Sequence, residues 1–162
     1  MILLGLGANL PSAVGPPVAT LEAALAALER AGVRVVACSR WYRTAPVPAS
    51  DQPWFVNGVA QVETKLAPSE LIALLQKIES EFGRKRGLRD AARSLDLDIL
   101  DYDGLVEAGP DLILPHPRMH QRAFVLKPLA EIAPDWRHPK LDKPVSALIA
   151  ALPPDQKAEP IA

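Results

Sequence analysis

The chain has 162 residues, of which 49% are hydrophobic and 23% charged, and its formal net charge is −1. These values predict one globular domain over residues 1–162, and the overall charge gives no indication of nucleic-acid or membrane binding. One cysteine excludes an internal disulfide, and no apolar run is long enough to cross a bilayer, so we expect a cytoplasmic protein without membrane or nucleic-acid partners.

The N-terminal segment predicts strand, helix and strand in succession. Residues 1–6 are apolar and predict a first strand. A helix follows, which Gly32 can end as a C-terminal cap, and the β-branched residues of 33–43 predict the next strand. The helix is indicated by leucines that recur at helical spacing: Leu21, Leu25 and Leu28.

The middle of the chain predicts a third strand and a second helix. A proline-containing loop over residues 44–53 leads into a strand over 54–63. Pro68 suits the first turn of a helix, and Gly83 lies just past its end. The apolar stripe of this helix consists of Leu71, Leu74, Leu75, Ile78 and Phe82.

A basic loop over residues 84–93 then leads into a fourth strand that carries Asp96 and Asp98. This β-α-β-β-α-β order predicts an α+β, ferredoxin-like fold, with a mainly antiparallel sheet, two helices on one face and the other face left for function. A C-terminal helical extension follows, with a short strand near 112–114, a helix starting near 116–119 and another over 144–152. We expect the proline-rich tail after about residue 153 to fray.

Asp96 and Asp98 are two residues apart on a predicted strand, so both carboxylates face the same side, about 6.6 Å apart at their bases. Mg²⁺ prefers oxygen ligands, and a pair of ions can share such carboxylates with substrate phosphates. A solvated strand face would show the same alternation, so the pair alone does not decide between the two interpretations.

The loop before this strand concentrates positive charge in an otherwise balanced chain. Arginine offers paired donors that match phosphate oxygens, and the loop leads directly to the carboxylates. A solvated charged loop is the alternative for any single residue. Taken together, the two features favour a metal–phosphate site; the loop's cations are Arg84, Lys85, Arg86, Arg89 and Arg93.

Phe55 and Asn57 share a strand face, where a ring that stacks and an amide that hydrogen-bonds suit a flat heterocycle. A core phenylalanine beside a strand-end amide is the structural alternative. Other residues that could reach a nucleotide or its partner substrate are Gln76 and Glu79 on the second helix, and His116, Arg122 and Phe124 further along.

The chain resembles the 6-hydroxymethyl-7,8-dihydropterin pyrophosphokinase family of folate biosynthesis over nearly its whole length. The most specific block is residues 89–100, an Arg-x-Ala-Ala-Arg-x-x-Asp-x-Asp pattern with Phe-x-Asn upstream and Pro-His downstream. The other matching segments are Gly5-Leu6-Gly7-Ala8-Asn9-Leu10, Tyr42-Arg43-Thr44-Ala45-Pro46, Asp51-Gln52-Pro53-Trp54-Phe55-Val56-Asn57, and Leu114-Pro115-His116 through Phe124.

The resemblance implies an ATP- and Mg²⁺-dependent diphosphotransferase that attacks the β-phosphorus of ATP with the pterin hydroxymethyl oxygen and releases AMP. It implies that Asp96 and Asp98 hold two Mg²⁺ ions, and that Arg84 and Arg93 close on the phosphates. The implied ATP site adds Gln76, Glu79, Ile99, His116 and Arg122. The implied pterin site consists of Thr44, Val47, Phe55, Asn57 and Phe124. Nothing in the sequence demands an oligomer, so we expect a monomer.

Several positions depart from the family pattern and motivate the hypothesis of weaker ATP binding. Asp90 stands where some members carry a tryptophan, and Ala92 where proline is common, so less preorganisation is expected. The remaining departures are Val47-Pro48, Asp111, Ile113 and Pro117.

Two other classes of function remain open from the residues. A ferredoxin-like RNA-binding module would use the sheet face and the basic loop, but the aromatic-rich strand motif of such modules is missing. A non-catalytic ligand-sensing domain would bind without turnover, and the fold cannot exclude it.

Overall fold

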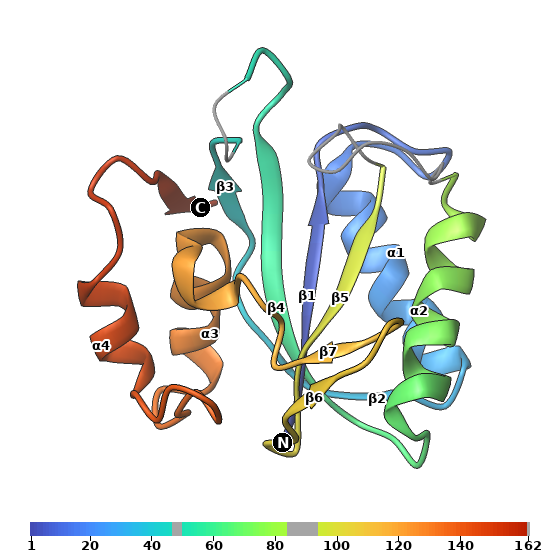
Figure 1. The fold of residues 1–162 in the computed structure, drawn as a ribbon. Coiled ribbons are helices and arrows are strands. Elements are labelled where there is room, and N and C mark those ends of the chain that lie inside the picture. The colour runs from blue at the N-terminus through green and yellow to red at the C-terminus, as the bar shows by residue number, and fades with distance from the viewer. Residues whose placement is uncertain (47–49, 84–93, 162) are drawn as a thin grey trace.

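The computed structural model describes residues 1–46, 50–83 and 94–161, and its elements follow the predicted order (Figure 1). Bends and turns connect the elements. Their bounds are β1 Ile2–Ala8, α1 Pro17–Arg30, β2 Arg34–Cys38, β3 Tyr42–Thr44, β4 Phe55–Glu63, α2 Pro68–Glu81, β5 Asp96–Tyr102, β6 Glu107–Ala108, β7 Ile113–Leu114, a 3-10 helix Met119–Gln121, α3 Ala123–Ile132, α4 Val145–Ala150 and β8 Ala158–Pro160.

The central sheet is antiparallel, with the order β5-β1-β4-β3-β8, and β2 also pairs with β4. Its first strands give the pairing of a ferredoxin-like fold, which confirms the predicted class. In this arrangement β1 lies between β4 and β5, and residues 2–7 pair with both strands.

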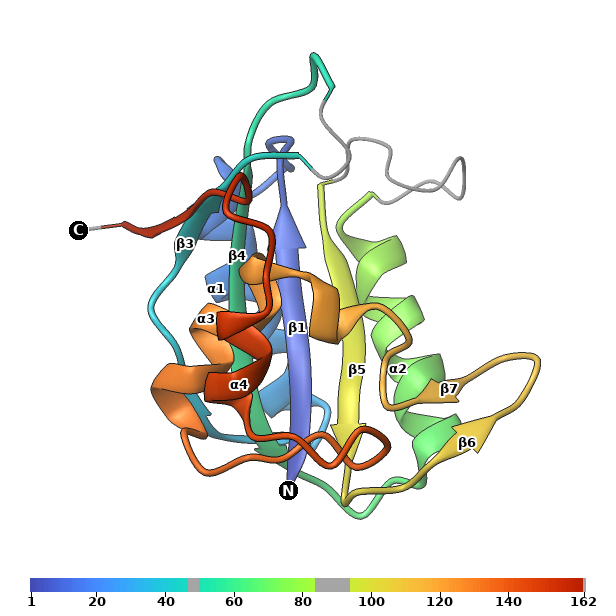
Figure 2. The ribbon, with the colours of Figure 1, turned by 60° about the vertical axis from the view of Figure 1, so that its left-hand side comes forward.

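Helices lie on both sides of the sheet, α1 and α2 on one side and α3 and α4 on the other (Figures 1 and 2). Helices α1 and α2 bury leucines against one face, and α3 and α4 bury a second apolar cluster against the other. The second face, which we expect to be left for function, is therefore partly covered by helices as well. That face carries Leu3, Val59 and Leu100, which need apolar cover, and α3 and α4 supply it.

Residues 33–43 form two strands instead of the single strand predicted. The break lies at Ser39, whose hydroxyl accepts the Val59 N–H at 3.0 Å and donates to the Arg40 carbonyl at 2.8 Å. Trp41 then packs over Gly58, where an added Cβ would lie 2.5 Å from the indole ring. Side-chain hydrogen bonds that replace the regular ladder cannot be read from β-propensity.

The C-terminal segment is ordered where fraying is expected. Strand β8 pairs with β3, bringing Ala158 opposite Thr44 and Pro160 opposite Tyr42. The composition of this segment suggested a solvated tail, but its backbone hydrogen bonds complete the edge of the sheet. The helix expected near residues 116–119 also differs, since a 3-10 turn precedes α3.

A β-bulge in β5 brings a buried carboxylate to the face covered by α3 and α4. Leu4 pairs with Ile99 but Leu3 pairs with Asp101, so β5 has one extra residue at this point. Asp101, only 4% exposed, accepts the Trp136 indole N–H at 2.8 Å and the Gly104 N–H at 3.1 Å.

Replacing this carboxylate is expected to destabilise the fold. Asp101→Ala leaves the buried Trp136 N–H without its acceptor, which costs about 2 kcal/mol of unfolding free energy. Urea unfolding followed by intrinsic fluorescence measures the change. The exposed Asp135→Ala is the control and should stay within about 0.5 kcal/mol of the wild type; equal losses in the two variants contradict a structural role for the Asp101–Trp136 bond.

Candidate active site

The site begins with a row of residues across three strands. In the register of the sheet, Gly7 on β1 pairs with Asp96 on β5 and with Asn57 on β4. Because neighbouring strands lie about 4.8 Å apart, a carboxylate and an amide stand on either side of a residue with no side chain. In the next row on this face, Gly5 lies between Asp98 on β5 and Val59 on β4.

Gly5 and Gly7 form the floor of a cleft of about 330 Å³, including space open to solvent. The two glycines pair with the two aspartates of β5, Gly5 with Asp98 and Gly7 with Asp96, and all four line the cleft. Other side chains would fill this space: a Cβ on Gly7 would lie 2.3 Å from the Asn57 Oδ1 atom. Among the described residues, the lining consists of Gly5, Leu6, Gly7, Asn57, Gly58, Asp96, Asp98, Leu100, His116, Arg122, Phe124 and Val125.

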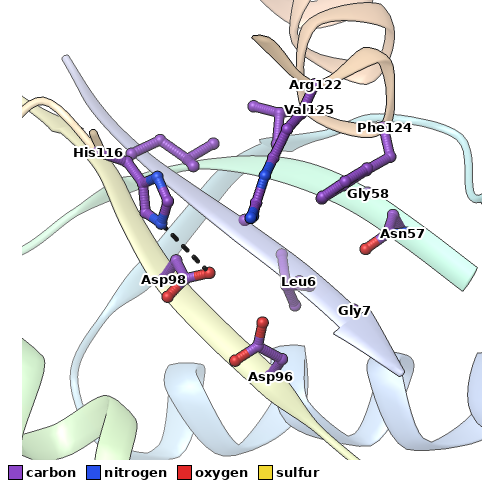
Figure 3. A pocket seen from close by; sticks show the side chains of 12 residues that line it. Leu6, Gly7, Asn57, Gly58, Asp96, Asp98, His116, Arg122, Phe124 and Val125 are labelled. Atoms are coloured by element: carbon purple, nitrogen blue, oxygen red, sulfur yellow. Dashed lines mark ion pairs between the residues drawn. The ribbon is translucent and has the colours of Figure 1, made fainter. Parts of the chain in front are cut away.

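Asp96 and Asp98 both project into this cleft and are both partly exposed, as the strand alternation predicts (Figure 3). The intervening Leu97 faces the opposite core. Its N–H donates to the Glu79 carboxylate at 2.8 Å, so the helix α2 fixes β5 between the two aspartates.

His116 stands beside the second carboxylate. Its Nε2 atom lies 4.0 Å from an Asp98 oxygen, and its backbone N–H donates to the Leu100 carbonyl at 2.9 Å. The Nδ1 atom accepts the Arg118 N–H at 3.2 Å. Burial, aided by the positive charges of Arg122 and Arg118, lowers the pKa of His116 to about 4. The imidazole is therefore neutral near pH 7, with its proton on the nitrogen that faces Asp98.

Arg122 and Phe124 enter the cleft from the start of α3. The Arg122 guanidinium carbon lies 5.2 Å from the centre of the Phe124 ring, within the range of a cation–π contact. In Figure 3 the arginine extends toward the carboxylates, while the ring lies nearer Asn57. The cleft thus has a charged end and an aromatic, amide-bearing end.

The orientation of the Asn57 amide is fixed by a buried hydroxyl. Its Nδ2 atom donates to Thr44 Oγ1 at 2.7 Å, and Asn57 and Thr44 are 8% and 1% exposed. One amide N–H is thereby committed to Thr44, and the amide oxygen lies over Gly7.

Five predicted site residues do not line this cleft: Thr44, which holds the Asn57 amide, and four others. Phe55 is half-buried at the start of β4, two residues from Asn57. Ile99 packs in the core against α1 and α2, Glu79 is buried behind β5, and Gln76 is exposed on α2. Their side chains do not enter the described cleft, and Glu79 acts on β5 through the Leu97 N–H.

Three further predictions, Val47, Arg84 and Arg93, lie outside the described residues, as do the departures at Pro48, Asp90 and Ala92. Their roles stay predictions. Within the described segments, no group of three or more His, Cys, Asp or Glu side chains forms a metal site. The two aspartates nevertheless supply the hard oxygen donors, partly solvated, that Mg²⁺ accepts while keeping other ligands.

Six residues of the lining have no role in the prediction from sequence: Gly5, Leu6, Gly7, Gly58, Leu100 and Val125. Gly5 and Gly7 could have been predicted as site residues, because two glycines at i and i+2 of a strand indicate close approach of a ligand or side chain. Leu100 and Val125 could not have been predicted, since their sequence pattern is that of ordinary core residues.

Relatives agree with this arrangement. The model of the 7,8-dihydro-6-hydroxymethylpterin-pyrophosphokinase (HPPK) family matches residues 3–134. A Pseudomonas aeruginosa protein named 2-amino-4-hydroxy-6-hydroxymethyldihydropteridine pyrophosphokinase is 46% identical, covering 94% of this chain and 91% of its own. A Synechocystis protein of the same name is 41% identical, covering 91% of this chain and 73% of its own.

Solved structures show the same fold. The crystal structure of a Plasmodium falciparum HPPK-DHPS triple mutant with SDX-DHP superposes with a TM-score of 0.71 at 15% identity. The match covers 92% of this chain and 43% of that one, so the present chain spans less than half of the solved protein. By the match to the family model and the identity to its full-length relatives, the chain belongs to the 7,8-dihydro-6-hydroxymethylpterin-pyrophosphokinase family.

Proposed function

We propose that the cleft between Asp96, Asp98, Arg122 and Phe124 is the active site for the reaction of this family. The chain is a pyrophosphokinase of folate biosynthesis, which transfers a pyrophosphoryl group from ATP to the hydroxymethyl group of 6-hydroxymethyl-7,8-dihydropterin. The observation that carries the assignment is the convergence of two carboxylates, an arginine, an amide and an aromatic ring on one glycine-floored cleft.

Asp96 and Asp98 would hold the two Mg²⁺ ions. Bound there, the ions supply neutralisation of the triphosphate charge. The partial exposure of both carboxylates supports this role, because coordinating oxygens need access to phosphate and water. The buried Glu79 on α2 keeps the strand in place between them.

The remaining residues of the charged end would bind ATP. Arg122 offers paired N–H donors to phosphate oxygens, and His116 offers its Nε2 proton. Arg84 and Arg93 are proposed to join them on the phosphates. Further residues proposed for the ATP site, from positions beside the cleft, are Gln76, Glu79 and Ile99.

The opposite end would bind the pterin. Phe124 offers a ring face, and the fixed Asn57 amide offers an acceptor and one N–H to a heterocycle edge. Phe55, Thr44 and Val47 are proposed to complete this pocket. The pterin oxygen then forms a bond to the β-phosphorus of ATP, the bond from that phosphorus to the α,β-bridging oxygen breaks, and the hydroxymethyl proton is lost as AMP leaves. Positioning and charge stabilisation carry such a transfer.

The protein acts on small molecules, and we propose that it does so as a cytoplasmic monomer without nucleic-acid partners. The balanced charge of the chain supports the last point. No helix of the described segments has the length and apolar character needed to cross a membrane.

The nucleotide product tests the function directly. ATP, MgCl₂ and 6-hydroxymethyl-7,8-dihydropterin should yield AMP and the pterin diphosphate in equal amounts, measured by chromatography and ³¹P NMR. Omitting the pterin or adding EDTA should stop AMP formation. ADP as the product would indicate transfer of a single phosphoryl group, and pterin-independent AMP would indicate hydrolysis; either result contradicts the proposal.

Removing either carboxylate should separate activity from stability. Asp96→Ala and Asp98→Ala are each expected to lower kcat/KM by at least about a hundredfold, since each removes a metal ligand and no core contact. Thermal unfolding of the variants should stay near that of the wild type. Asp135→Ala serves as the exposed control for activity. A fall in melting temperature that parallels the lost activity would make the pair structural.

Gly7 should be required for the pterin end of the cleft. Gly7→Ala places a Cβ 2.3 Å from the Asn57 Oδ1 atom, so the amide must move. We expect pterin affinity to fall about tenfold, with a smaller change for a non-hydrolysable ATP analogue, both measured by calorimetry. At Gly109 a Cβ would make an ordinary 3.5 Å contact, and Gly109→Ala is the matched control. Wild-type pterin affinity in Gly7→Ala would refute this role.

A further inference from the structure

The C-terminal segment contacts elements that carry or support residues of the cleft. Strand β8 lies beside β3, whose last residue, Thr44, hydrogen-bonds the cleft amide of Asn57. The contact continues past the strand, because the Ala45 N–H donates to the Lys157 carbonyl at 3.2 Å. None of residues 155–160 lines the cleft itself.

One side chain of this segment, that of Gln156, forms two hydrogen bonds with the backbone at the start of α3. The Gln156 Oε1 atom accepts the Ala123 N–H at 2.8 Å, and its Nε2 donates to the Gln121 carbonyl at 2.7 Å. These two backbone groups flank Arg122, so a single amide holds the chain on both sides of the arginine that enters the cleft.

The hydrogen bond from the Ala123 N–H to Gln156 satisfies a donor that helix α3 cannot satisfy itself. N–H groups in the first turn of a helix have no acceptor within the helix, and the N-cap residue of α3, Arg122, makes no side-chain cap hydrogen bond. Gln156 supplies the missing acceptor for Ala123, the residue directly before Phe124.

A small buried cluster joins the same three elements. Ala158 of β8, Tyr42 of β3 and Ala123 of α3 pack together and are 7%, 5% and 2% exposed. Apolar packing and hydrogen bonds therefore both tie this segment to α3, which carries Phe124, and to β3, whose Thr44 holds the cleft amide of Asn57.

We infer that residues 155–160 form a positioning element of the active site, in which Gln156 sets the backbone of Arg122 and Phe124 relative to Thr44 and Asn57. Gln156 is a positioning residue, because it contacts the backbone around cleft residues and not the cleft. The inference rests on the proposed function only for the identity of the ligands that Arg122 and Phe124 meet.

The test compares Gln156→Ala with Lys157→Ala. Lys157 is the adjacent residue, its side chain is exposed, and its backbone carbonyl stays available to Ala45 in the variant. We expect Gln156→Ala to lower kcat/KM about tenfold for both substrates, while Lys157→Ala stays within about twofold of the wild type. Melting temperatures are measured alongside, and any fall for Gln156→Ala should be small compared with the lost activity.

Amide hydrogen exchange supplies a readout independent of turnover. The Ala123 amide should be protected in the wild type and in Lys157→Ala, and should lose protection in Gln156→Ala. A wild-type chain that forms no AMP would contradict the proposed function, yet exchange at Ala123 would still test the contact. An unprotected Ala123 amide in the wild type overturns the inference, as does unchanged kcat/KM in an active Gln156→Ala variant that has lost this protection.

Discussion

The pairing of β1 with both β4 and β5 is the constraint on which the rest of the site depends. It places Gly7 between Asp96 and Asn57, and it fixes the distance between the carboxylate end and the amide-bearing end of the cleft. Backbone hydrogen bonds set this register, and a slip of one residue would turn both aspartates into the core. The relative positions of the cleft residues are therefore set by the sheet, as is expected for a reaction that depends on positioning.

Elements on both faces of the sheet help to position the cleft residues. On one, α2 places Glu79 against the Leu97 N–H and steadies the strand that carries the carboxylates. On the other, α3 brings Arg122 and Phe124 over the glycine floor, supported by the Asp101–Trp136 bond beneath and by Gln156 beside it. Hydrogen bonds between elements thus support the site at all three places. Two of them, Glu79 to the Leu97 N–H and Asp101 to Trp136, are buried, so their loss would be costly.

Much of this arrangement follows from local pattern in the sequence. Alternation predicts that Asp96 and Asp98 share a face, and the element order predicts the ferredoxin-like sheet. The ordered tail and the break at Ser39 could not be predicted, because both depend on hydrogen bonds between segments distant in the chain. The hydrogen bonds of Gln156 to α3 could not be predicted for the same reason. A partly exposed glutamine in a proline-rich segment has no sequence pattern that identifies its partners.

The central claim is that one cleft binds the metal-bound triphosphate through Asp96 and Asp98 and the pterin beside Phe124 and Asn57. A crystal structure with Mn²⁺, a non-hydrolysable ATP analogue and the pterin tests it most directly. The account predicts two anomalous peaks within coordination distance of the two carboxylates, with the pterin ring against Phe124. Metal peaks bound away from both aspartates, or a pterin bound outside the glycine-floored cleft, would contradict it.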